Sequence, residues 1–174
     1  MTSTDQPAIE LILRLLDDGN STRLYTRICD ERGLSYDVSA GYEALRDVGF
    51  CDVACDMAHD EAHTVLSEVF SVIRSLRDEG PTPAELDKAK ARHRWSIEHM
   101  LDDPSELADF FADATLRDYA PTLSNLRDRI DSVSLDGVRE AARRLFRSEN
   151  LNAVIVGLQS AKQRKALEKL VYEF

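Results

Sequence analysis

The chain has 174 residues, of which 43% are hydrophobic and 31% charged, and this composition predicts one soluble globular domain over residues 1–174. The formal net charge of −10 argues against a nucleic-acid partner, because neutralising phosphates requires a basic face, but it is compatible with basic or neutral peptides. No apolar run approaches the ~20 residues of a membrane span, and the N-terminus MTSTDQPAIE lacks the basic-then-apolar pattern of a secretory signal.

The sequence contains three cysteines, an odd number that does not suggest a disulfide framework. Cys51 and Cys55 share one face of a predicted strand and would lie about 13 Å apart, too far to bond to each other. Free thiols are typical of a reducing compartment. We therefore expect a cytoplasmic, bacterial location.

The first predicted helix follows Asp5, which can cap it, and carries Pro7 in its first turn. Its apolar stripe consists of Ile9, Ile12, Leu13 and Leu16. The polar run Asp17–Asn20, which includes Gly19, ends the helix.

A second helix is predicted after this glycine turn. Ser21 can cap it, and its apolar positions recur at three- and four-residue spacing, namely Leu24, Tyr25 and Ile28. Gly33 is the left-handed residue expected at its end. A helix of roughly three turns therefore leads directly into the next segment.

From residue 36 the pattern changes to a period of two, which predicts a hairpin of two strands with a turn near Arg46 and Asp47. The apolar face consists of Tyr36, Val38, Ala40 and Tyr42 in one strand and Cys51, Val53, Cys55 and Met57 in the other. Polar residues alternate with them, so the hairpin should bury one side.

The rest of the chain is mostly helical in pattern. A helix over residues 62–76 stops at Gly80-Pro81, and Thr82-Pro83-Ala84-Glu85 is a capping box that starts a long helix. Asp103, Thr122, Ser134 and Ser160 stand at the starts of four more helices, with a break at 119–121. The apolar run Leu151–Gly157 predicts a central strand covered on both faces.

Early strands, a helical middle and one late strand predict an α+β domain, an antiparallel-rich mixed sheet backed by a layer of helices. His93 lies on the apolar stripe of the long helix and is expected to be a core histidine. The arginines of the run 139–147 are expected to lie on a solvated helix face.

Several of these segments together resemble one known family. The residues concerned are Gly19, Ser21-Thr22-Arg23-Leu24, Arg32-Gly33-Leu34-Ser35-Tyr36, the stretch 80–90, and Glu149-Asn150-Leu151 with Val154-Ile155-Val156-Gly157. In this order they are similar to the C-terminal, non-zinc domain of insulinase/pitrilysin-like zinc metallopeptidases, including the processing-peptidase branch. That domain begins with a strand before the first helix. We expect this leading strand to be missing, because Met1 comes too late for it, so the chain is either truncated or a reduced domain.

The resemblance implies a substrate-binding role for Tyr36. In active members a tyrosine here and an arginine seven residues earlier hold the substrate backbone beside the zinc, where a phenol and a guanidinium can stabilise negative charge. Here Cys29 stands seven residues earlier, and a thiol lacks the forked donors of a guanidinium. The predicted substrate-binding residues are Tyr36, Arg32, Gly33 and Gly19. The alternative for Tyr36 is an ordinary aromatic side chain on the buried face of the hairpin.

No catalytic or metal-binding residue is predicted. The family's zinc motif H-x-x-E-H is absent, and the glutamate of His59-Asp60-Glu61-Ala62-His63 is misplaced for it. A tetrahedral site formed by these histidines with Cys51 and Cys55 would need a tight fold-back of the chain. We therefore expect no cofactor in this chain, and zinc only in a partner domain or subunit.

The leading hypothesis is a non-catalytic, substrate-binding domain that forms half of a peptide-degradation chamber. It requires a zinc-bearing peptidase partner and should be inactive alone. Peptide would bind at the free edge of the sheet, which also makes a homodimer plausible. The alternative is a structural or assembly domain of the same fold with no role in proteolysis, and Cys29 in place of the arginine favours it.

Overall fold

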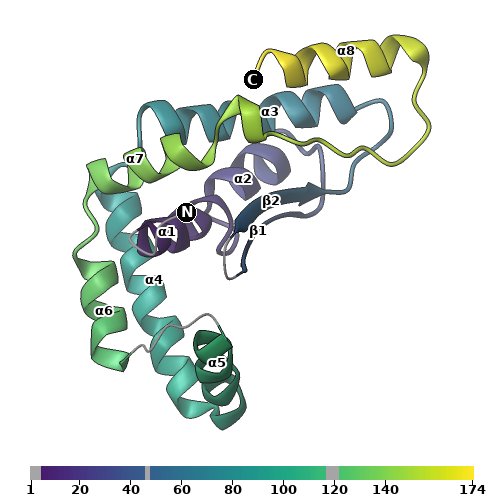
Figure 1. Cartoon of the computed structure of the whole chain (residues 1–174). Helices are drawn as coiled ribbons and strands as arrows, with labels where there is room; N and C mark the ends of the chain where they lie inside the picture. The colour runs from purple at the N-terminus through teal and green to yellow at the C-terminus, as the bar shows by residue number, and fades with distance from the viewer. Residues whose placement is uncertain (1–4, 46–47, 117–121) are drawn as a thin grey trace.

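The computed structural model describes residues 5–45, 48–116 and 122–174, and these are mainly helical, with a single two-stranded hairpin (Figure 1). The longer helices are α1 (Gln6–Leu16), α3 (Ala62–Asp78), α4 (Pro83–Asp102), α5 (Pro104–Leu116), α6 (Leu123–Asp131), α7 (Leu135–Leu145) and α8 (Ala161–Tyr172). The short helix α2 (Arg23–Tyr25) continues into the π-helical turn η1 (Thr26–Asp30), and η2 (Ser148–Asn150) is a 3-10 turn. The predicted turn at 46–47 and the predicted break at 119–121 lie outside the described residues.

Helix α1 lies at the centre of the core. Its side chains at Ile9, Leu11, Ile12 and Leu16 are fully buried, because α4 and α7 both pack against it. Helix α3 packs on α7 and α8, and α5 and α6 lie beside α4 at the lower end of the molecule (Figure 1). The core is therefore built by helices crossing α1 rather than by the sheet.

The hairpin forms as predicted. Strand β1 (Val38–Ala44) pairs with β2 (Gly49–Cys55) in an antiparallel register that places Val38 opposite Cys55. Burial alternates along β2, where Cys51, Val53 and Cys55 are half-buried between exposed neighbours. Met57 lies beyond β2 and is 36% exposed, so its predicted place on the buried face is wrong.

The predicted helix caps from Thr82 onward are confirmed. Thr82 and Glu85 form the complete capping box, with Pro83 in the first turn. The hydroxyls of Thr122 and Ser134 each accept the main-chain N–H three residues later, and Ser160 forms a second capping box with Gln163. Such caps involve only neighbouring residues, which makes them readable from sequence.

The two predicted caps near the start of the chain are confirmed only in part, since Asp5 is the N-cap residue of α1 by position. The Asp5 side chain makes no capping bond and instead pairs with Arg144 on α7, with a shortest N–O distance of 2.6 Å. The N-cap of α2 is Thr22 rather than Ser21. The α1 stripe is also displaced, since Leu11 and Leu15 are buried while Leu13 is only half-buried.

The run Leu151–Gly157 does not form the predicted strand. It is irregular, and Val154 and Val156 are 87% and 94% exposed. A strand needs a neighbour for its N–H and C=O groups, and the two-stranded sheet of the described residues contains only β1 and β2. The α+β class with helices backing a sheet is confirmed, but the sheet is smaller than expected. No described helix is long and apolar enough to cross a bilayer.

Candidate functional site

Gly33 and Arg32 lie where the second helical segment ends. Gly33 has a φ of +59°, the left-handed conformation expected at a helix end, and its N–H donates to the carbonyl of Cys29 at 3.1 Å. Arg32 pairs with Glu68 of α3 at 2.7 Å, and Arg27 pairs with the same carboxylate at 2.6 Å. Arg32 therefore attaches this helix end to α3.

Tyr36 lies just before β1 and not on the buried face of the hairpin. Its side chain is fully exposed, at 101% of the reference area, so the interpretation as a buried aromatic residue is wrong. The backbone beside it is held in place by Ser35, whose Oγ lies 2.6 Å from the carbonyl oxygen of Asp56 and accepts the N–H of Asp37. The phenol thus projects into solvent from an anchored segment.

Cys29, seven residues before Tyr36, lies in η1. It is half-buried and packs against the core, and burial raises the pKa of its thiol, with the nearby Cys55 acting in the same direction. Burial likewise raises the pKa of the Cys51 thiol to about 12. These are neutral, inert thiols, and Cys29 offers no positive charge to a ligand near Tyr36.

Gly19 forms the turn after α1 with a φ of +93°, which favours glycine. Its carbonyl accepts the Thr22 hydroxyl at 2.8 Å. On one side, the Asp17 carboxylate accepts the N–H of Ala40 in β1 at 2.9 Å. On the other, Asp18 accepts from Arg92 of α4, which with Arg14 lowers the pKa of the Asp18 carboxyl. The turn joins α1 to both the hairpin and α4.

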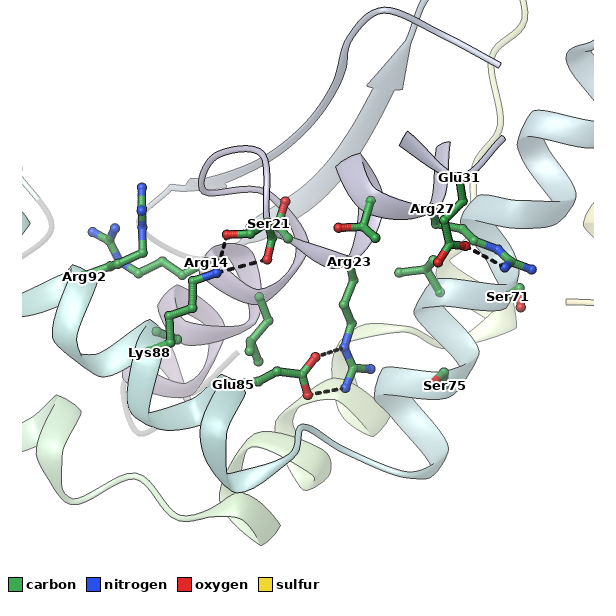
Figure 2. Close-up of a pocket in the computed structure, with 15 residues that line it drawn as sticks. Arg14, Ser21, Arg23, Arg27, Glu31, Ser71, Ser75, Glu85, Lys88 and Arg92 are labelled. Atoms are coloured by element: carbon green, nitrogen blue, oxygen red, sulfur yellow. Dashed lines mark hydrogen bonds and ion pairs between the residues drawn. The ribbon is translucent and has the colours of Figure 1, made fainter. Parts of the chain in front are cut away.

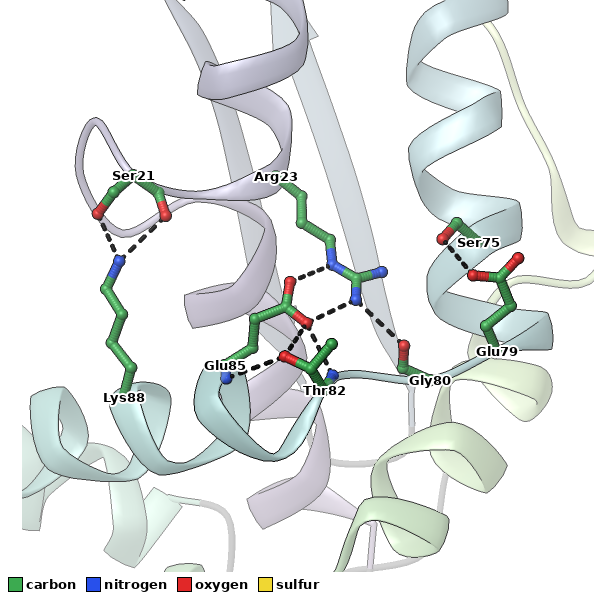
Figure 3. A network of polar contacts seen from close by, with 8 residues as sticks. All are labelled: Ser21, Arg23, Ser75, Glu79, Gly80, Thr82, Glu85 and Lys88. Carbon is green, nitrogen blue, oxygen red and sulfur yellow. Dashed lines mark hydrogen bonds and ion pairs between the residues drawn. The ribbon is translucent and has the colours of Figure 1, made fainter.

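A polar network that the sequence did not predict joins two of the family-like motifs (Figure 3). Arg23 donates to both carboxylate oxygens of Glu85, at 2.7 and 2.9 Å, and also to the carbonyl of Gly80 at 3.1 Å. Glu85 in addition accepts the N–H of Thr82. The bonds from Arg23, reinforced by those from Thr82, lower the pKa of Glu85 to about 2. The sequence shows both motifs, one around Arg23 and one around Glu85. It does not show that these two residues, 62 positions apart, form an ion pair.

Described residues of α1 contribute to the lining of each of the following two cavities. One, of about 400 Å³, lies among α2, η1, α3 and α4 and is rich in arginine (Figure 2). The other, of about 700 Å³, lies among α1, α4, α5 and α6. Tyr36, Arg32, Gly33 and Gly19 line neither of them. The predicted site residues are thus spread over a helix end, a strand entrance and a turn.

His93 is a core histidine, as predicted. Its side chain is 12% exposed, and its Nδ1 accepts a hydrogen bond from Arg14 Nε at 3.4 Å. Burial, helped by the Arg14 charge, lowers the pKa of His93 to about 4. The imidazole is therefore neutral near pH 7.

The described residues contain no group of three or more His, Cys, Asp or Glu side chains arranged to hold a metal ion. His59 and His63 are exposed near the start of α3. Arg143, Arg144 and Arg147 are exposed, as predicted for a solvated helix face, and Arg139 is half-buried. Arg144 also pairs with Asp5, and Arg143 donates to the carbonyl of Arg77 at 3.3 Å.

The sequence is similar to several zinc proteases. The zinc protease PqqE of Helicobacter pylori is 23% identical over 153 residues, which are 87% of this chain and 34% of that protein. An uncharacterized zinc protease of Mycobacterium tuberculosis is 25% identical over 158 residues, 90% of this chain and 36% of that protein. The chain thus spans about a third of the length of these curated relatives.

The fold is similar to solved structures. A protease from Helicobacter pylori matches with a TM-score of 0.77 and 22% identity over 84% of this chain and 35% of that one. A structure from Bordetella parapertussis, described as the inactive peptidase domain of a protein assigned as a zinc protease, matches with a TM-score of 0.73 and 23% identity, over 84% of this chain and 80% of that one.

A family model described as the peptidase M16 inactive domain matches residues 1–92. This range includes the glycine turn, the second helix, the hairpin and the start of α4. It therefore also includes both halves of the Arg23–Glu85 network. The chain belongs to the peptidase M16 inactive-domain family.

Proposed function

We propose that this domain is the non-catalytic, substrate-binding half of a peptide-degradation chamber, with zinc and the catalytic base supplied by another domain or subunit. The observation that carries the proposal is the match to an inactive peptidase domain, together with relatives that are named zinc proteases and of which the chain spans about a third. The absence of H-x-x-E-H from the sequence agrees with zinc residing elsewhere.

Peptide binding would use Tyr36 and the sheet edge. An extended peptide can add to an exposed strand through main-chain hydrogen bonds. The β1 edge is partly occupied, because Asp17 accepts the N–H of Ala40 there, so β2 is the more accessible edge. The exposed Tyr36 phenol can donate to a peptide carbonyl from its anchored position, while Arg32 is committed to Glu68. The same edge would serve a homodimer, which size-exclusion chromatography with light scattering measures.

The first test is reconstitution. The isolated chain should show no zinc-dependent cleavage of a fluorogenic peptide, and mixing with the H-x-x-E-H subunit or domain of the same organism should produce cleavage that a chelator abolishes. Cleavage by the isolated chain, suppressed by the chelator, contradicts the proposal.

Cys29 favours a second candidate, a structural domain without a role in proteolysis. The neutral thiol packed against the core supplies none of the charge that an arginine would bring beside Tyr36. Peptide affinity separates the two candidates, using Tyr36→Phe and the matched control Tyr172→Phe, which alters a phenol that is 90% exposed on α8. A loss confined to Tyr36→Phe supports substrate binding, whereas equal, negligible affinities support the structural role.

A further inference from the structure

The cavity of about 400 Å³ is strongly basic for a protein with a net charge of −10. Its lining includes five cationic side chains, those of Arg14, Arg23, Arg27, Lys88 and Arg92. Among the described residues, the only carboxylates in the lining are those of Glu31 and Glu85. This local excess of positive charge opposes the overall charge of the chain.

At one end of the cavity the charges are balanced. Arg23 is matched by Glu85 in a two-bond pair. Arg27 bonds Glu31 at 3.0 Å and Glu68 at 2.6 Å. These guanidinium groups are engaged by carboxylates of the chain and have little capacity left for an anion.

At the other end, near Ser21, they are not balanced. Arg92 donates to both carboxylate oxygens of Asp18, at 2.7 and 2.9 Å, and Arg14 donates to the same carboxylate at 2.8 Å, so two guanidinium charges face one carboxylate. Lys88 reaches across the cavity to the hydroxyl and the main-chain carbonyl of Ser21 (Figure 2), and no carboxylate of the described residues pairs with it. The neutral His93 beside Arg14 adds no charge. Two positive charges are therefore uncompensated at the Ser21 end.

Hydrogen-bond donors accompany these charges. The Lys88 ammonium has three N–H groups and uses two on Ser21. The Ser21 hydroxyl accepts from Lys88, so its own proton is free to donate elsewhere. The side chains of Arg14 and Arg92 are only 21% and 36% exposed, so water screens their charges less than at a fully open surface.

We propose that the Ser21 end of this cavity binds a small oxyanion, a phosphate or carboxylate group, through hydrogen bonds from Lys88 and the Ser21 hydroxyl, with the charges of Arg14 and Arg92 nearby. Planar or tetrahedral oxyanions accept several charge-assisted hydrogen bonds at once, and a cavity of this volume falls in the range of ligand sites. This inference is independent of the proposed role in proteolysis. The source of the oxyanion is either inorganic phosphate or the C-terminal carboxylate of a peptide.

The test is titration of the full chain at low ionic strength, followed by ¹H–¹⁵N NMR shifts of the amides around Ser21 and Lys88. Three probes are used: inorganic phosphate, an N-acetylated tripeptide with a free carboxylate, and the same tripeptide amidated. We expect saturable shifts with phosphate or the free acid, none with the amide, and weakening as salt is added. Whichever oxyanion binds identifies the source, and binding of neither overturns the proposal.

Two substitutions in α4 test whether the oxyanion binds in the cavity. Lys88→Gln should weaken binding about tenfold, as expected for one charged hydrogen bond. Lys90→Gln is the matched control, because Lys90 also donates to a main-chain carbonyl, that of Asp131 at 2.9 Å, but does not line the cavity. Ser21→Ala, which keeps the carbonyl contact of Lys88, gives a second measurement. Equal affinity in Lys88→Gln and wild type, or an equal loss in Lys90→Gln, overturns the assignment.

Discussion

Two regions of the molecule differ in side-chain burial and in backbone hydrogen bonding. One is the junction between α2 and α4, and the other is the run Leu151–Leu158. At the junction Leu24 is fully buried and the carbonyl of Gly80 accepts from Arg23. In the run, Val154, Val156 and Leu158 are at least 87% exposed, and the backbone is in no strand. Stability should therefore depend on the helices around α1, and the run should contribute little to it.

The largest expected difference comes from removing the same side chain in both regions. Leu24→Ala opens a cavity at a position with 0% exposure and should lower the free energy of unfolding by about 3 kcal/mol. Leu158→Ala, at a position with 88% exposure, should change it by less than about 0.5 kcal/mol. Urea denaturation of both variants measures the difference. Similar values for the two would remove the distinction between the regions.

The next effect concerns the ion pair at the junction. Arg23 and Glu85 are 18% and 33% exposed, and Arg23→Met leaves a half-buried carboxylate without its main partner. We expect a loss of roughly 2 kcal/mol, less than for a fully buried pair because water still reaches Glu85. Arg164→Met, in the exposed pair with Glu168 on α8, is the control and should cost about 0.3 kcal/mol. A loss at Arg23 no larger than this control would mean that the network does not stabilise the junction.

A smaller effect should appear as a pH dependence. The pKa of His93 is about 4 in the folded protein, below its ordinary value of 6.5, so the unfolded chain binds this proton more readily. The stability due to neutral His93 is therefore fully present above pH 6.5 and is lost as the pH falls toward 4. Relative to His93→Gln, wild type should lose roughly 1 to 2 kcal/mol across this window in thermal or urea unfolding.

His99→Gln, which alters an exposed residue of the same helix, is the control for this measurement. Its unfolding curve should follow that of wild type over the whole window. A difference between His93→Gln and wild type that stays constant with pH would contradict the assignment of a lowered pKa to His93.

The features predictable from the sequence are those formed between residues that are close together in the chain. The capping boxes at Thr82 and Ser160 need only the residue three positions later, and both formed. The hairpin was predictable because β1 and β2 are adjacent in the chain and alternate in burial. In each case the residues that form the pattern and the residues they bond to lie in the same short stretch of sequence.

The features that could not be predicted need distant partners. Arg23 meets Glu85 only because α4 folds back over the glycine turn. The Asp5 side chain makes no capping bond at α1, and its carboxylate pairs instead with Arg144 of α7. Tyr36 continued the alternating pattern of the hairpin but lies outside β1, since a two-residue period does not mark where a strand begins. The cavity beside Ser21 is lined by residues of α1, α2, η1, α3 and α4, which are distant in the sequence and come together only in the fold.

The smallest expected change tests the run itself. The double substitution Val154→Thr and Val156→Thr should leave the free energy of unfolding within about 0.5 kcal/mol of wild type, because both side chains are almost fully exposed. In a central strand covered on both faces, the same change would bury two hydroxyls and cost several times more. Urea denaturation distinguishes these outcomes.

An exposed apolar run of β-branched residues is also a site for association between chains, so light scattering should detect less self-association in the variant than in wild type. If stability fell sharply while self-association stayed the same, the run would be packed within one chain in solution, and the two regions would not differ as the structure indicates.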